Sequence, residues 1–187
     1  ELVAADLASP TDDLLLVSRK AQSVRFHATD AQLRPMGRAT SGVTGMRFRG
    51  DDSLLSLSVI HEGEDPDVFV VFENGMAKRS PASDWNAKGR GGLGVAVAKI
   101  TERNGDLVGA LTVSEDDEVL VIMGKGNIVR MPVSPVCAPP RSLPACRART
   151  RPVAAGSTNS PRRSRRLVSS PVHTPVKASG KNRRTVF

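Results

Sequence analysis

The 187-residue chain carries 27 Lys and Arg against 19 Asp and Glu, but these charges are unevenly distributed. All 19 acids and 15 of the basic residues lie in residues 1–133, whereas residues 134–187 hold 12 basic residues and no acid. No apolar run approaches the roughly 20 residues that span a bilayer, and the N-terminus lacks the pattern of a signal peptide, so we expect no association with a membrane.

The first predicted strand, Leu14–Val17, is apolar at every position, which is typical of a strand buried on both faces of its sheet. Ser23–Phe26 follows across a short turn and is expected to pair with it. A long connection then carries Arg34 and Arg38 to the next strand, Val43–Phe48.

We expect Leu54–Ile60 to begin a second unit, which continues through Val68–Phe72, an Asn-Gly hairpin turn and Met76–Ser80. A glycine-rich loop, Lys88-Gly89-Arg90-Gly91-Gly92-Leu93-Gly94, then leads into the predicted strand Val95–Ile100. A third unit contains three further predicted strands, which are Leu107–Val113, Val119–Met123 and Asn127–Met131.

These units are copies of one repeat. The segment Asp13–Val17 recurs as Asp67–Val71 and Glu118–Ile122, and the basic residues that follow, Arg25, Lys78 and Arg130, are separated by 53 and 52 residues. A repeat near 50 residues with about four strands is typical of propeller blades. We therefore predict an all-β fold, in which residues 1–133 form about two and a half blades of four-stranded antiparallel sheets.

Beyond Val133 the repeat stops, and the chain becomes rich in Pro, Ser and Arg. We call residues 134–187 the basic tail and expect it to be disordered. Two interpretations remain open: a native basic tail, or a segment read out of frame, since a frameshift would remove both the repeat and the acids. Cys137 and Cys146 both lie in the tail, which argues against a disulfide framework and fits a reducing cytoplasm.

The glycine-rich loop formally matches the dinucleotide fingerprint G-x-G-x-x-G, but that fingerprint requires a following helix, and a strand pattern follows here. We therefore expect no cofactor. A loop with little side chain, in which only Lys88 and Arg90 can reach out, suits the close approach of DNA phosphate. In this interpretation Gly91 and Gly92 keep the backbone bare, with positive φ at Gly92. The alternative is that the glycines only let the chain turn a corner.

No metal site is expected. His27, His61 and His173 have no neighbours at metal-ligand spacing. The acids of residues 115–118 lack the spacing of a calcium loop and are better explained as a solvated turn. Acids gather in the turns before each first strand, whereas the residues from Leu14 to Arg49 include seven basic residues and one acid. We therefore expect basic and acidic surfaces to be separate.

Three segments, residues 34–43, 75–80 and 89–95, resemble the C-terminal domain of the bacterial DNA gyrase A subunit. The signature box of that family reads Q-R-R-G-G-K-G. Arg90, Gly91, Gly92 and Gly94 match it, while Lys88, Gly89 and Leu93 stand in place of the Gln, the first Arg and the Lys. This degenerate box is similar to the second box of actinobacterial enzymes. The resemblance covers residues 1 to about 133 and implies a β-pinwheel of six blades whose rim wraps DNA.

The resemblance also implies a role and partners. Wrapping would support negative supercoiling by an ATP-dependent type IIA topoisomerase at the cytoplasmic nucleoid. The implied partners are double-stranded DNA, the remainder of the gyrase A subunit and, through it, the ATPase subunit. The family cuts DNA with a tyrosine of another domain, and this chain has no tyrosine, so we expect no enzyme activity from it alone. The expected DNA-binding residues are Arg25, Arg34, Arg38, Lys78, Arg79, Lys88, Gly89, Arg90, Gly91, Gly92, Gly94 and Arg130.

Two other functions remain open. One is the C-terminal DNA-binding domain of the homologous topoisomerase IV, which lacks a good box. The other is a propeller that binds a protein partner through its face. A DNA titration at rising salt separates this last class from the other two.

Overall fold

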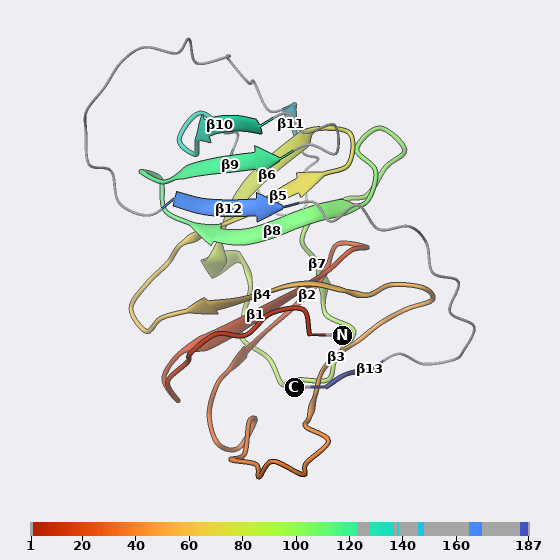
Figure 1. Ribbon diagram of the computed structural model, residues 1–187, viewed down its shortest axis with the longest axis vertical. Coiled ribbons are helices and arrows are strands. Elements are labelled where there is room, and N and C mark those ends of the chain that lie inside the picture. Colours follow the sequence, from red (N-terminus) through yellow and green to blue (C-terminus); the bar gives the residue numbers. More distant parts are fainter. Residues whose placement is uncertain are drawn as a thin grey trace.

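The computed structural model describes residues 2–122, 128–136 and 138, together with the strand segments 146–147, 165–169 and 184–186. The described chain is built of short strands arranged in small stacked sheets (Figure 1). The strands are β1 (Asp13–Ser18), β2 (Gln22–His27), β3 (Thr44–Arg47), β4 (Leu54–Ile60), β5 (Asp67–Phe72), β6 (Met76–Pro81), β7 (Val95–Ala96), β8 (Leu107–Val113), β9 (Glu118–Ile122), β10 (Ile128–Pro132), β11 (Cys146–Arg147), β12 (Arg165–Ser169) and β13 (Arg184–Val186). Helical structure in the described residues is limited to the 3-10 turn η1 (Ala82–Asp84), and no helix there could cross a lipid bilayer.

Two equivalent four-stranded antiparallel sheets form the centre of the molecule. Their strand orders are β4-β1-β2-β7 and β8-β5-β6-β11. The prediction of four-stranded antiparallel blades is therefore confirmed for two repeats. In a third sheet, β10-β9-β12, two strands of the third repeat pair with one strand of the basic tail, and β3 pairs with β13.

The assignment of edge strands to blades differs from expectation at three places. β8, which was expected in the third unit, pairs with β5 and completes the second sheet. β4 pairs with β1 and so completes the first sheet instead of beginning the second. β7 comes from the second repeat but pairs with β2, which transfers this strand to the sheet of the preceding repeat. The pattern of apolar residues identifies a strand, but it does not say which neighbour the strand will bond to.

The β7 strand is also shorter than predicted. Only Val95–Ala96 is in ladder pairing, and the chain then turns inward, where Val97 and Ala98 are 0% and 3% exposed. The amide of Val97 donates to the carbonyl of Ala21 at 2.9 Å. The predicted strand Val95–Ile100 thus begins at a sheet edge and then passes into the core.

The central strands are buried on both faces, as the uniformly apolar first strand predicted. On β1, Leu15 and Val17 pack between the first two sheets, whereas Leu14 and Leu16 pack toward β3. β5 alternates in the same way, because Val68, Val70 and Phe72 face the first sheet while Phe69 and Val71 face the third repeat. Side chains alternate along a strand, so each central strand joins two cores. Each fully buried aliphatic or Phe side chain contributes about 1.5–3 kcal/mol.

Three pieces of the basic tail form strands, which differs from the disorder expected there. β11 pairs with β6, β12 pairs in parallel with β9, and β13 pairs with β3. Each joins a strand that would otherwise be a sheet edge. The unpaired N–H and C=O groups of such an edge can form hydrogen bonds with any extended segment. Apart from these strands and residues 134–136 and 138, the tail lies outside the described residues.

Candidate nucleic-acid interface

The glycine-rich loop belongs to the second repeat but is bound to the first. The amide of Gly91 donates to Gly45 O at 2.6 Å, and the amide of Arg47 donates to Gly92 O at 2.8 Å. The amide of Lys88 donates to the carbonyl of Arg25 at 2.8 Å. These bonds, with the transfer of β7 to β2, fasten the loop beside β3 and the connection that precedes it.

Two of the glycines are required by the backbone. Gly91 and Gly94 both have φ +75°, a conformation that favours glycine. A Cβ at Gly94 would lie 2.2 Å from the carbonyl oxygen of Ser23, whereas at Gly91 the nearest atom would be 3.6 Å away. Gly92 has no positive φ, so the expectation for it was wrong, and the turn is made by its neighbours.

The guanidinium of Arg90 bonds within the protein. Its Nε donates to Gln32 O at 2.5 Å, and its Nη1 donates to Thr44 O at 3.3 Å. Its backbone amide donates to Gln32 Oε1 at 3.3 Å. Arg90 therefore connects the glycine-rich loop to the start and the end of the connection that carries Arg34 and Arg38.

The two segments that meet here are basic. Residues 31–50 and 85–101, which we call the box surface, contain seven Lys and Arg and no acid. Six of these cations are exposed, and three of them, Arg47, Arg49 and Lys99, are additions to the predicted set. The exposed six are Arg34, Arg38, Arg47, Arg49, Lys88 and Lys99. The high density of basic residues up to Arg49 was the signal in the sequence for the first two additions. Figure 1 shows β3 and the connection before it at the end of the molecule opposite β9 and β10.

A hollow of about 260 Å³ opens beside the loop. Its lining includes Arg25, Lys88, Asn86 and the loop residues Gly89 and Gly92. Trp85, which also lines it, is 2% exposed and donates from Nε1 to Ser23 Oγ at 2.8 Å, so this ring is a packing residue beneath the surface. The hollow therefore brings two basic residues, Arg25 and Lys88, and the glycines of the loop together with one acid, Asp84.

Three predicted contacts instead form ion pairs inside their own blades. Arg25 lies 2.7 Å from Asp13, Arg79 lies 2.9 Å from Asp67, and Arg130 is bonded to Glu118. The strand registers place these arginines opposite Leu15, Phe69 and Leu120, so they occupy the same position of three repeats. These ion pairs neutralise part of the charge expected to bind phosphate.

Lys78 was wrongly matched to this set. Arg79 is the counterpart of Arg25 in the ladders, whereas Lys78 lies opposite Val70, as Val24 lies opposite Leu16. The side chain of Lys78 is 1% exposed. A buried ammonium is out of reach of phosphate, so Lys78 leaves the set of surface residues.

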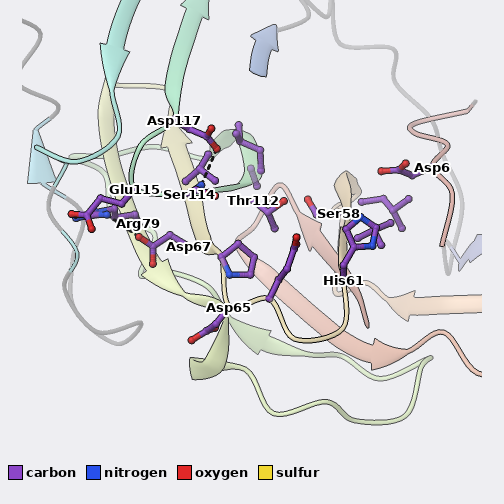
Figure 2. Close-up of a pocket in the computed structure, with 17 residues that line it drawn as sticks. Asp6, Ser58, His61, Asp65, Asp67, Arg79, Thr112, Ser114, Glu115 and Asp117 are labelled. Atoms are coloured by element: carbon purple, nitrogen blue, oxygen red, sulfur yellow. Dashed lines mark hydrogen bonds and ion pairs between the residues drawn. The ribbon is translucent and has the colours of Figure 1, made fainter. Parts of the chain in front are cut away.

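A second, wider cleft has the opposite charge. Figure 2 shows this space of about 900 Å³, lined by residues of β4, β8 and the turns beside them. Its lining contains one arginine, Arg79, which is paired with Asp67 and lies 3.6 Å from Glu115. Six carboxylates line it, which are Asp6, Glu64, Asp65, Asp67, Glu115 and Asp117. Acids of several turns thus gather in this cleft, and phosphate would be repelled from it.

Comparison with known proteins gives one consistent result. A family model described as the DNA gyrase C-terminal domain, beta-propeller, matches residues 12–61 and 67–114. The DNA gyrase A subunit of Streptomyces coelicolor is 53% identical over 136 residues, which cover 73% of this chain and 16% of that protein. The Mycobacterium tuberculosis protein of the same name is 52% identical over 130 residues, covering 70% of this chain and 15% of that protein. The chain thus spans about a sixth of the length of these relatives.

Solved structures agree on the fold. A DNA gyrase A C-terminal domain superposes with a TM-score of 0.65 at 27% identity, over 73% of this chain and 46% of that chain. A C-terminal domain of DNA topoisomerase IV has a TM-score of 0.68 at 18% identity, over 75% of this chain and 43% of that chain. The second likeness shows the β-pinwheel fold alone.

Proposed function

The chain belongs to the DNA gyrase A C-terminal domain family, and on that premise we propose that it binds double-stranded DNA along the box surface and bends it. One observation carries this proposal. Residues 31–50 and 85–101 lie side by side in the fold, and together they hold seven basic residues and no acid. Phosphate contacts of this kind release counterions and position DNA without reading its sequence.

Each part of the site has a distinct role in this proposal. The six exposed cations of the box surface contact phosphates. Arg90 holds the connection in place, since its guanidinium bonds to Gln32 O and Thr44 O. Bending a short DNA site by a large angle costs on the order of 1–6 kcal/mol, which several such contacts can repay.

In the longer protein, this binding would wrap DNA in support of negative supercoiling by a type IIA topoisomerase. The protein partners would then be the remainder of the gyrase A subunit, together with the ATPase subunit, at the nucleoid. The topoisomerase IV interpretation is weaker, because the likeness to that domain is 18% in sequence, against 53% to a gyrase protein.

The experiment measures the affinity for a labelled duplex by fluorescence anisotropy in a salt series. We expect Arg38→Ala and Lys88→Ala to weaken binding to any sequence and to lower the salt slope by about 0.9 for each phosphate that is no longer contacted. The matched control is Arg103→Ala, which removes an exposed arginine outside the box surface. Binding that ignores salt, or a control that weakens binding as much as the variants do, would refute the proposal. An absence of DNA binding would favour the protein-interaction propeller.

A further inference from the structure

Every nitrogen of the Arg25 guanidinium has a partner within the protein. Nε and Nη2 lie 2.8 Å and 2.7 Å from Asp13 Oδ2, and Nη1 donates to Ala82 O at 2.7 Å and to Trp85 O at 3.2 Å. The side chain is 17% exposed. A guanidinium bonded in this way has no free edge for the two parallel hydrogen bonds that arginine makes to a phosphate. Arg25 is therefore occupied by the fold.

The two carbonyls that Arg25 binds belong to the turn that leads into the glycine-rich loop. This turn, residues 82–85, contains η1 and ends three residues before Lys88. The amide of Lys88 donates to the carbonyl of Arg25 at 2.8 Å. Arg25 thus holds the start of the loop twice, once through its side chain and once through its backbone.

The neighbouring position on β2 connects this turn to the end of the loop. Ser23 is 0% exposed, and its hydroxyl accepts a hydrogen bond from Trp85 Nε1 at 2.8 Å and donates one to Val95 O at 2.9 Å. The loop therefore runs between two fixed points, the turn of residues 82–85 and the strand β7. Both points are bonded to β2, so a shift of the turn would move the loop against the rest of the box surface.

The second repeat has the same arrangement without a glycine-rich loop beside it. Arg79 pairs with Asp67 at 2.9 Å, and its Nε and Nη2 donate to Val136 O at 3.0 Å and to Ser134 O at 3.3 Å. Its side chain is 12% exposed. Arg79 therefore matches Arg25 in partners and burial but lies outside the box surface, which makes it a control within the same chain.

We propose that Arg25 is a positioning residue of the DNA-binding surface. Asp13 orients its guanidinium, which fixes the turn of residues 82–85 and so determines where Lys88 and the glycines of the loop meet a phosphate. The inference rests on the proposed function, and it gives Arg25 a part in DNA binding that needs no contact of its own with DNA. A lysine keeps the charge but lacks the planar fork that joins one carboxylate to two carbonyls. The variant Arg25→Lys therefore separates positioning from direct contact.

Hydrogen exchange of the free protein tests the positioning without DNA, because exchange reports local opening of the backbone. We expect Arg25→Lys to speed amide exchange in residues 86–95. Arg79→Lys loses the same kinds of contact and should leave these amides as protected as in the wild type, with each protein measured equally far below its own melting point. Unchanged protection of the loop in Arg25→Lys overturns the proposal, and so does an equal loss of protection in Arg79→Lys.

The salt series with a labelled duplex tests the consequence for DNA. Arg25→Lys should weaken binding and lower the salt slope as Lys88→Ala does, by about 0.9 for each phosphate contact that is lost, although its net charge is that of the wild type. Arg79→Lys should bind like the wild type. If the wild type binds DNA and Arg25→Lys binds equally well, this inference alone is refuted. A wild type that binds no duplex refutes the proposed function and this inference with it.

Removal of the acid gives a further test in which the two roles of Arg25 predict opposite results. If Arg25 were a phosphate contact held back by Asp13, then Asp13→Asn would release it and tighten DNA binding. As a positioning residue it loses its orientation instead, so Asp13→Asn should bind more weakly than Asp67→Asn. That control removes the same charge from the equivalent position of the second repeat. Binding by Asp13→Asn that equals or exceeds that of Asp67→Asn contradicts the proposal.

Discussion

The three glycines at the end of the glycine-rich loop allow a graded test of its backbone. Gly92→Ala meets no atom closer than 3.8 Å and has no positive φ to strain. Its stability should stay level or rise by about 0.4–1 kcal/mol, because alanine restricts the unfolded chain. At Gly91 an added Cβ would also have room, but alanine would have to adopt φ +75°, which costs about 1–2 kcal/mol of stability.

Gly94→Ala adds a steric conflict to the same strain. Its Cβ would lie 2.2 Å from Ser23 O and 2.8 Å from Ser23 C, and both atoms belong to the strand that pairs with β7. Overpacking of this kind costs about 1–3 kcal/mol beyond the strain, so a total loss of about 2–5 kcal/mol is expected.

Urea unfolding followed by the fluorescence of the single tryptophan, Trp85, measures all three variants. A loss of 1 kcal/mol corresponds to a melting point lower by about 2–4 °C in a chain of this size. The reasoning is refuted if Gly92→Ala is as unstable as Gly94→Ala, or if Gly94→Ala unfolds like the wild type.

Three further predictions concern Asp12, Arg90 and the basic tail. The amide of Ser9 lowers the pKa of Asp12 to about 2 against the desolvation that raises it, with help from the Ser9 and His61 side chains and the amide of Glu62. Asp12 therefore stabilises the fold above its unfolded pKa near 3.8 and loses this effect as the pH falls toward 2, so the melting points of the wild type and Asp12→Asn should converge over that range. Arg90→Ala should speed amide exchange in residues 31–43 of the free protein, because Arg90 holds this connection. It should also weaken DNA binding by more than the loss of a single phosphate contact would. Unchanged exchange would show that Arg90 does not hold the connection. A chain ended after Ala138 should bind all DNA more weakly with a flatter salt slope, since the missing segment is basic, and equal affinity would remove the tail from the DNA-binding surface.

Local sequence was enough to place most strands. Leu14–Val17, Leu54–Ile60 and Leu107–Val113 were predicted within a residue or two of β1, β4 and β8. Apolar periodicity and turn residues act over a few positions, so they can be read directly from the chain. The charge asymmetry and the glycine-rich loop likewise located the basic surface around Lys88 and Arg38.

Partner choice was decided only by the tertiary structure. The periodicity of Val95–Ala96 does not encode that β7 leaves its own repeat to pair with β2, because edge hydrogen bonds are made by backbone groups common to all residues. The tertiary structure also decided which arginines form ion pairs. Arg25, Arg79 and Arg38 are the same residue type in the sequence, but an acid lies beside the first two across the ladder, and Arg38 is exposed in a segment without acids. Whether an arginine binds its own fold or remains available to a phosphate depends on which carboxylates and carbonyls folding brings within about 3 Å of it.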